Sequence, residues 1–251
     1  MALNLTIDQG NSSAKIGLWD AQGNLVESTT HIRFVARDVA KIAEGQAIDN
    51  AIYCTVSTRP PTMMKALQRR AGHVIEFGIN TPLPITVDYR TPHTLGLDRL
   101  AAAMGAFGLP GCQGRELLVV DIGTAITYDR VTSDARYIGG NIAPGIYMRL
   151  KALNHYTARL PLVDPRGCAA PMWGNDTRSA LLAGAVRGVV AEIEYYRNSL
   201  DADTQVVLTG GYADVVEPLL SFRPIMEHNL VSMGLLNILK YNRDINAHSL
   251  S

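Results

Sequence analysis

The chain has 251 residues, of which 47% are hydrophobic and 18% charged, with no formal net charge and a pI near 7.0. This composition is too apolar for a disordered chain, and it offers no basic field for a nucleic acid. The N-terminal residues do not resemble a signal peptide, no apolar run reaches the roughly 18 residues of a membrane span, and the three cysteines lack C-x-x-C spacing. We therefore expect a cytoplasmic protein of one or two domains, with no nucleic-acid partner, no membrane partner and no zinc site.

An Asp-x-Gly turn joins the first two predicted strands. Residues 3–7 alternate in polarity like a strand, Asp8-Gln9-Gly10 follows, and residues 15–19 alternate again. A carboxylate at the end of a buried strand requires a partner, and a glycine turn lets backbone approach an anion. A β-turn in which the aspartate bonds its own backbone is the alternative interpretation of an isolated motif.

The rest of the N-terminal half alternates strands with helices. Residues 24–30 and 51–56 are predicted strands, residues 35–44 are weakly helical, and residues 61–71 form a helix that begins with proline. An antiparallel meander followed by strand–helix alternation indicates an α/β lobe of the ribonuclease-H-like kind.

A proline-stiffened segment, residues 80–89, precedes a predicted Ala-rich helix over residues 100–107. Asp98 and Arg99 fall in the first turn of that helix, where exposed N–H groups and the helix dipole favour anions. A structural role, with Asp98 as the helix N-cap and Arg99 in a salt bridge, is the alternative.

Residues 108–114 contain three glycines and one proline, and they are the clearest linker in the chain. We therefore expect an N-terminal lobe over residues 1–112 and a C-terminal lobe over residues 113–251. Each lobe would be of ordinary domain size.

The strand–turn–strand pattern recurs about one domain length later. Residues 117–120 are a buried strand, Asp121-Ile122-Gly123-Thr124 is the turn, and an apolar alternation resumes at Ile126. Two anion-binding turns, one in each lobe, would face each other across a cleft and suit a magnesium nucleotide.

Further glycine-rich turns precede predicted helices in the C-terminal half. Gly139 to Gly145 leads into a helix over residues 146–155, and a long amphipathic helix covers residues 179–200. A strand over residues 204–208 is followed by Gly210-Gly211, a place where backbone could approach an adenosine, and then by a helix over residues 213–220. The final helix, residues 230–241, is apolar on one face and is predicted to be core.

Five motifs together resemble the type III pantothenate kinases of the acetate and sugar kinase/Hsp70/actin superfold, and the resemblance covers Asp8 to Gly211. In chain order they are Asp8-Gln-Gly-Asn-Ser; Tyr89 followed by Gly96-Leu-Asp98-Arg99; Asp121-Ile-Gly-Thr124-Ala; Gly139-Gly-Asn-Ile-Ala-Pro-Gly145; and Gly174-Asn-Asp-Thr177. The resemblance implies an α/β fold with two ribonuclease-H-like lobes, a duplicated actin-like ATPase fold, and a nucleotide cleft between them.

The resemblance also implies ATP-dependent phosphorylation of the terminal hydroxyl of pantothenate, the first step of coenzyme A synthesis. Asp98 matches the family's proton acceptor. Pantothenate would be held by Arg99, Tyr89, Gly96 and Leu97 of one subunit and by Thr177 of the partner in a homodimer.

The nucleotide and its ions are assigned by the same resemblance. Asp121 would bind a monovalent cation, potassium or ammonium, and the ATP would be accompanied by Mg²⁺. The ATP phosphates would be bound by Thr124 and by the first turn, which comprises Asp8, Gln9, Gly10, Asn11, Ser12, Ser13, Ala14 and Lys15. The chain departs from the family pattern at Ile126 and Ser12, where threonine is usual, so one phosphate-facing hydroxyl is in doubt at Ile126.

The residue chemistry agrees with a kinase that has no P-loop. Phosphoryl transfer needs positioned anion-binding turns, metal-binding carboxylates and one carboxylate near the acceptor hydroxyl. No Gly-Lys dipeptide occurs in the chain, which excludes a P-loop kinase. A sugar kinase of the same superfold and a non-catalytic nucleotide-binding protein, either actin-like or a degenerate paralogue, are the alternatives.

Overall fold

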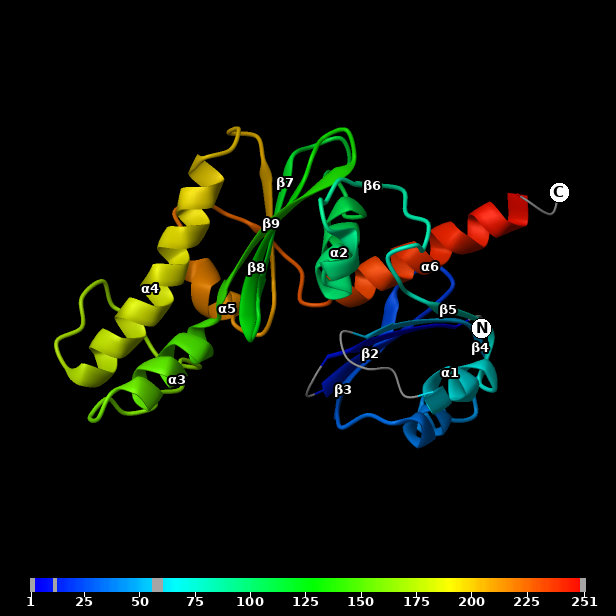
Figure 1. Cartoon of the computed structure of the whole chain (residues 1–251), viewed down its shortest axis with the longest axis horizontal. Coiled ribbons are helices and arrows are strands. Elements are labelled where there is room, and N and C mark those ends of the chain that lie inside the picture. The colour runs from blue at the N-terminus through cyan, green and yellow to red at the C-terminus, as the bar shows by residue number, and fades with distance from the viewer. Residues whose placement is uncertain (1–2, 11–12, 56–60, 249–251) are drawn as a thin grey trace. The chain divides into compact units, whose positions relative to one another are not determined.

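The computed structural model describes residues 3–10, 13–55 and 61–248, which form two compact units (Figure 1). The first unit comprises Met1–Leu109 together with Asn229–Ser251, and the second comprises Pro110–His228. The division near residue 110 lies close to the expected linker. The last helix differs from the expected boundaries, because its apolar face packs in the first unit and not in the second.

The first unit is built on a five-stranded sheet in the order β3-β2-β1-β4-β5. The chain runs antiparallel from β1 through β2 to β3, whereas β1, β4 and β5 are parallel. The strands are β1 (Asn4–Gln9), β2 (Ser13–Trp19), β3 (Leu25–Ile32), β4 (Ile48–Thr55) and β5 (Ala71–Glu76). Strand β5 is not predicted from the sequence, because its short Gly- and His-containing stretch has no clear alternation.

One face of this sheet forms a hydrophobic core with short helices. Ile7 of β1 and Ile16 of β2 pack with Val39 and Met63. The helical and short extended elements of the unit are η1 (Ala36–Lys41), α1 (Pro61–Gln68), β6 (Thr86–Val87), η2 (Pro92–Thr94), α2 (Leu97–Phe107) and α6 (Leu230–His248).

Helices α2 and α6 pack closely together, as Figure 1 shows. A Cβ atom at Gly234 of α6 would lie 2.7 Å from the backbone nitrogen of Gly105 and would also collide with the Ala101 carbonyl. Both glycines therefore lie where the two backbones approach each other. This close packing is what brings the C-terminal helix into the first unit.

The second unit repeats the strand order and directions of the first. Its strands are adjacent in the order β11-β10-β7-β8-β9; β7, β8 and β9 are antiparallel, and β7, β10 and β11 are parallel. Their bounds are β7 (Leu117–Ile122), β8 (Ala125–Val131), β9 (Arg136–Pro144), β10 (Gln205–Thr209) and β11 (Ile225–Met226). The predicted duplicated ribonuclease-H-like fold is confirmed.

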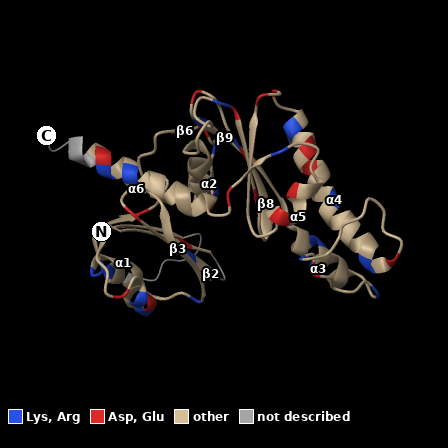
Figure 2. Cartoon of the chain, turned by 180° about the vertical axis from the view of Figure 1, so that it is seen from behind, with Lys and Arg blue, Asp and Glu red and all other residues tan. Residues whose placement is uncertain are grey.

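Helices cover this second sheet through a core of buried aliphatic side chains. They are α3 (Ile146–Tyr156), α4 (Thr177–Asn198), α5 (Ala213–Val216) and η3 (Glu217–Leu219). The helix expected over residues 213–220 is divided into α5 and η3, because Pro218 cannot donate a helical hydrogen bond. Acidic and basic residues are interspersed along α4 (Figure 2). Among the described residues, no helix is long and apolar enough to cross a membrane.

Candidate active site

The first Asp-x-Gly turn joins β1 to β2, as predicted. The Gly10 N–H donates to the Ser13 carbonyl at 2.9 Å, which closes a tight turn. Asp8 pairs with Lys15 across the two strands, and both side chains are half-buried. Two residues of the predicted phosphate-binding segment, Asn11 and Ser12, lie outside the described residues.

Two members of the predicted segment are held by the protein itself. The Tyr53 hydroxyl donates to Gln9 Oε1 at 2.6 Å, and Gln9 Nε2 donates to the Phe34 carbonyl at 3.3 Å. The Ala14 side chain is fully buried in the core. The Ala14 side chain is therefore part of the core, and the Gln9 amide serves to fix the end of β1.

Asp8 and Asp98 both act electrostatically on the thiol of Cys54, near the end of β4. The Cys54 side chain is fully buried and lies beside Asp8 in the parallel β1–β4 register. Burial raises the pKa of the Cys54 thiol, and the negative charges of Asp8 and then Asp98 raise that pKa further. The first turn and the predicted proton acceptor therefore both lie within electrostatic reach of one buried thiol, in the same unit. Cys54 is the residue here that sequence reasoning missed, because parallel register has no local signal.

Asp98 lies in the first turn of α2, as predicted, but Gly96 and not Asp98 is the helix N-cap. Asp98 Oδ1 accepts from the Arg99 N–H at 2.9 Å. A Cβ at Gly96 would lie 2.5 Å from Asp98 Oδ1, so the glycine makes room for this carboxylate. The capping role considered for Asp98 is therefore wrong, and its half-buried carboxylate stays near the helix start.

The other predicted acceptor-site residues differ in exposure. Arg99 is only 6% exposed, an unusual degree of burial for a charged side chain. Leu97 is half-buried in the same helical turn, and Tyr89 is half-buried in the segment between β6 and η2. A buried guanidinium suits recognition of a carboxylate, since it offers five donors in a planar fork.

The second Asp-x-Gly turn joins β7 to β8. The Gly123 N–H donates to the Ala125 carbonyl at 3.0 Å, and the Thr124 side chain is exposed. Asp121 at the end of β7 pairs with Thr127, so both side chains lie on the same face of the sheet. Carboxylate and hydroxyl groups thus gather at this turn.

Gly210 packs directly against Asp121. It has a positive φ of 96°, and a Cβ there would collide with Asp121 Oδ1 and lie 2.5 Å from the Ile122 nitrogen. The Tyr212 N–H donates to the Ile122 carbonyl at 3.1 Å, which fastens the turn after β10 to β7. The Gly210-Gly211 turn, considered as a contact for adenosine, therefore also keeps the Asp121 carboxylate in place.

Two further sequence features have structural explanations. Ile126 is fully buried in the core and faces away from Thr127, because successive residues of a strand alternate in direction. A hydroxyl at position 126 would point into that core.

The Gly139-Gly140 pair lies within β9. A Cβ at Gly140 would lie 2.7 Å from the Tyr128 carbonyl carbon, so the glycine allows β9 to approach β8 at this point.

Thr177 is the first residue of α4 and is exposed. Asp176 caps this helix by accepting from Arg178 N–H and Ser179 N–H, and its hydrogen bonds to Ser179 lower the pKa of its carboxyl group. Trp173, just before the cap, is 87% exposed.

A groove of about 740 Å³ follows α4 and is lined by small side chains and by Met172, Trp173 and Arg187.

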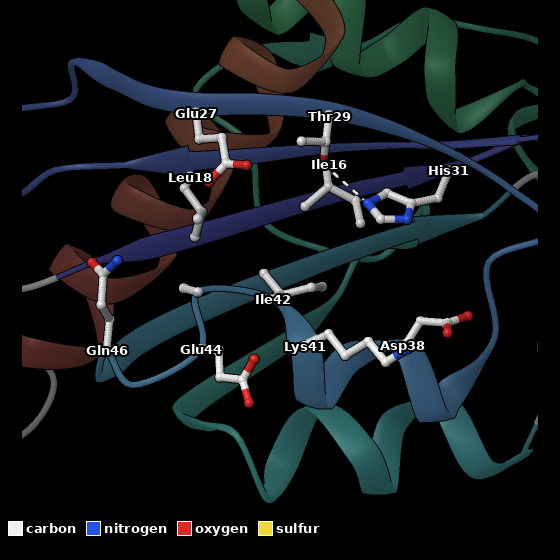
Figure 3. Close-up of a pocket in the computed structure, with 11 residues that line it drawn as sticks. Ile16, Leu18, Glu27, Thr29, His31, Asp38, Lys41, Ile42, Glu44 and Gln46 are labelled. Atoms are coloured by element: carbon white, nitrogen blue, oxygen red, sulfur yellow. Dashed lines mark hydrogen bonds between the residues drawn. The ribbon is translucent and has the colours of Figure 1, made fainter.

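A separate pocket of about 470 Å³ lies in the first unit (Figure 3). Its floor includes Ile16 and Ile42, and carboxylates from Glu27, Asp38 and Glu44 are found around it. The residues that line it include none of the predicted site residues. We therefore take the Asp-x-Gly turn of each unit, and the start of α2 in the first unit, as the candidate functional positions.

Comparison with known proteins gives matches over most of the chain. Residues 4–199 match the family model described as type III pantothenate kinase. A type III pantothenate kinase from Porphyromonas gingivalis is 37% identical over 96% of this chain and 100% of its own length, and one from Phocaeicola vulgatus is 38% identical over 96% and 99%.

Solved structures support the fold. A Baf family protein from Campylobacter jejuni aligns with a TM-score of 0.65 at 24% identity, over 96% of this chain and 99% of its own. A ROK family glucokinase from Streptomyces griseus aligns with a TM-score of 0.55 at 12% identity, over 96% and 99%. At these identities the likeness concerns the fold alone.

Proposed function

The chain belongs to the type III pantothenate kinase family, and from this premise we propose how its residues perform the family's reaction. That reaction is the ATP-dependent phosphorylation of pantothenate in coenzyme A biosynthesis. The observation that carries the residue assignment is that Asp8, the register partner of Cys54, and Asp98 both raise the pKa of the Cys54 thiol. It supports a site in which a phosphate-binding turn and a base act together.

We propose Asp98 as the general base. The terminal hydroxyl oxygen of pantothenate attacks the γ-phosphorus of ATP, and its proton passes to the Asp98 carboxylate. The bond from the γ-phosphorus to the bridging oxygen breaks, and ADP leaves with that electron pair. The hydrogen bond from the Arg99 N–H to Asp98 Oδ1 supports this role, because it orients the carboxylate at 2.9 Å.

The ATP phosphates are bound, in this proposal, by the turns after β1 and β7. Tight turns with glycine present their N–H groups to anionic oxygen. The Thr124 hydroxyl is exposed and can turn toward a ligand, and Lys15 adds a positive charge beside Asp8. The remaining proposed contacts come from Gln9, Gly10, Asn11, Ser12, Ser13 and the Ala14 backbone.

Pantothenate is an anion with one carboxylate, and the buried Arg99 is the proposed partner of that group. Tyr89, Gly96 and Leu97 complete the proposed acceptor site within the first unit. The space beside Asp98 that only glycine leaves at position 96 supports this assignment, because a side chain there would displace the base.

A kinase of this family uses ATP with a divalent metal, and the residues present suit such ions. Carboxylate, hydroxyl and backbone oxygens are the donors that Mg²⁺ and K⁺ prefer. When bound, these ions neutralise phosphate charge. We propose Asp121 as the ligand of the monovalent cation, because its carboxylate is half-buried and lies at the Gly123-Thr124 turn.

We propose a homodimer in which Thr177 reaches the partner's pantothenate. The groove along α4 supports a packing surface, since Ala183, Gly184 and Gly188 there allow another backbone to approach. Thr177 is exposed at the start of the same helix. The cytoplasmic location expected from the sequence stays a prediction.

The test is a coupled ADP-release assay with Mg–ATP and pantothenate, run in potassium and again in sodium alone. We expect potassium-dependent turnover with pantothenate and none with glucose or acetate. Equal turnover in sodium and in potassium would refute the proposed monovalent-cation site but would not bear on the acceptor assignment. Turnover with glucose instead of pantothenate would refute the acceptor site.

A further inference from the structure

The backbone of Pro144 and Gly145 lies directly behind the turn that binds phosphate in the proposed function. The Gly145 N–H donates to the Thr124 carbonyl at 3.0 Å. A Cβ at Gly145 would collide with the Gly123 and Thr124 carbonyls and lie 2.9 Å from the Thr124 carbonyl carbon. The place of the Thr124 turn therefore depends on what holds Pro144 and Gly145.

Arg149 of α3 holds that backbone. Its Nε donates to the Pro144 carbonyl at 2.8 Å, while its Nη2 donates to both carboxylate oxygens of Glu192 at 2.7 Å. The Arg149 side chain is 19% exposed, so solvent screens this ion pair less than a surface pair. One guanidinium thus joins the turn-supporting backbone to α4.

Glu192 is itself fixed by a third group. The Tyr128 hydroxyl donates to Glu192 Oε2 at 2.8 Å, and the Tyr128 ring is buried under α4. Burial and the neighbouring Glu192 raise the pKa of Tyr128, so its hydroxyl keeps its proton and remains a donor. A Cβ at Gly188 would lie 3.2 Å from Arg149 Nη1, so the absence of a side chain at position 188 provides space for the guanidinium.

The helices do not need this ion pair in order to pack. Ile146 and Leu150 of α3 share a buried apolar cluster with Val186 and Val189 of α4. In addition, the Arg149 side chain donates to the Pro144 carbonyl and to the Glu192 carboxylate. A planar fork can bond that carbonyl and Glu192 at once, which a lysine ammonium on its flexible stem cannot match.

We propose that Arg149 is a positioning residue for ATP, anchored by Glu192 and Tyr128, and that it sets the Thr124 turn through the Pro144–Gly145 backbone. This inference rests on the proposed function in assigning phosphate binding to that turn. It adds three residues that no Asp-x-Gly motif includes.

The test compares Arg149→Ala and Arg149→Lys with Arg130→Ala. Arg130 is a matched control on β8, because its ion pair with Glu116 at 3.2 Å does not involve Pro144. For Arg149→Ala we expect the KM for ATP and the Kd of a non-hydrolysable ATP analogue to rise about 10- to 100-fold, the effect of losing a charged hydrogen bond. The KM for pantothenate should change less than about twofold. For Arg149→Lys, the KM for ATP and the Kd of the analogue should lie between the wild-type and Arg149→Ala values. Arg130→Ala should leave all three constants near wild type.

Three outcomes would overturn the inference: an unchanged Kd for the analogue, an equal rise in both KM values, or a loss of stability alone. If Arg149→Ala does not fold, Arg149→Lys and Glu192→Gln answer the same question, since both retain one polar contact. Analogue binding is measured without pantothenate. A wild-type protein that binds the analogue but does not phosphorylate pantothenate would therefore refute the proposed function and not this inference.

Discussion

Gly210→Ala should damage the Asp121 turn, whereas Gly211→Ala should not. Gly210 has a φ of 96°, and an added methyl would lie 2.5 and 2.6 Å from the Ile122 backbone nitrogen and carbon while colliding with Asp121 Oδ1. Gly211 has nothing within 4 Å of the same position. The two adjacent glycines therefore form a matched pair that separates local crowding from a general effect of adding a methyl group.

The structure gives the size of the effect. A positive φ costs a residue with a side chain about 1–2 kcal/mol. Overpacking against backbone that cannot rotate away adds about 1–3 kcal/mol. The free energy of unfolding should thus fall by about 2–5 kcal/mol, so a domain whose stability lies well above the lower end of the ordinary range of about 5–15 kcal/mol remains folded.

Activity should fall further than stability suggests. Relief of the crowding requires a shift of roughly 1 Å in the Asp121–Ile122 backbone or in Gly210, and a misplacement of that size costs about 100-fold in rate. Urea unfolding measures the stability change, and the coupled assay with a potassium titration measures kcat and cation dependence. Equal behaviour of Gly210→Ala and Gly211→Ala in both measurements would refute the reasoning.

Four further predictions concern the proposed base, the cation site and the thiols. Asp98→Asn, which keeps the side-chain shape, should lower kcat about 10²- to 10⁴-fold with an unchanged urea midpoint; near-normal turnover would remove Asp98 as the base. Asp121→Asn should weaken or abolish potassium-dependent activation, and an unchanged potassium titration would assign the cation elsewhere. At pH 8, iodoacetamide should label the partly exposed Cys168 in the native protein and the buried Cys54 only after unfolding, as mass spectrometry would show; rapid native labelling of Cys54 would contradict its burial. Because burial, with Asp8 and Asp98, raises the pKa of Cys54, the native thiol stays protonated above about pH 8.5, where the unfolded thiol ionises. Stability should therefore decline as pH rises from there, and Cys54→Ala should make that decline shallower; identical slopes would refute the linkage.

Local sequence pattern predicted the parts of the site that are formed by residues close together along the chain. A buried strand, an Asp-x-Gly turn and a returning strand are neighbours along the chain, so the pattern of residues alone predicts both turns. The position of Asp98 in the first turn of α2 follows from its distance to the Ala-rich helix for the same reason. Repetition of the pattern predicted two lobes, and the family resemblance implied that the fold is duplicated.

Contacts between residues distant in sequence were decided only by the tertiary structure. The parallel register of β1 and β4 places Cys54 beside Asp8, and helix α6 packs on α2 in the first unit although it follows the second. In the second unit, Gly210 meets Asp121 and Arg149 meets Glu192. No local pattern encodes such contacts, because they form only when the apolar faces of separate elements are buried together. The distance between the packed backbones then depends on the size of the side chains between them.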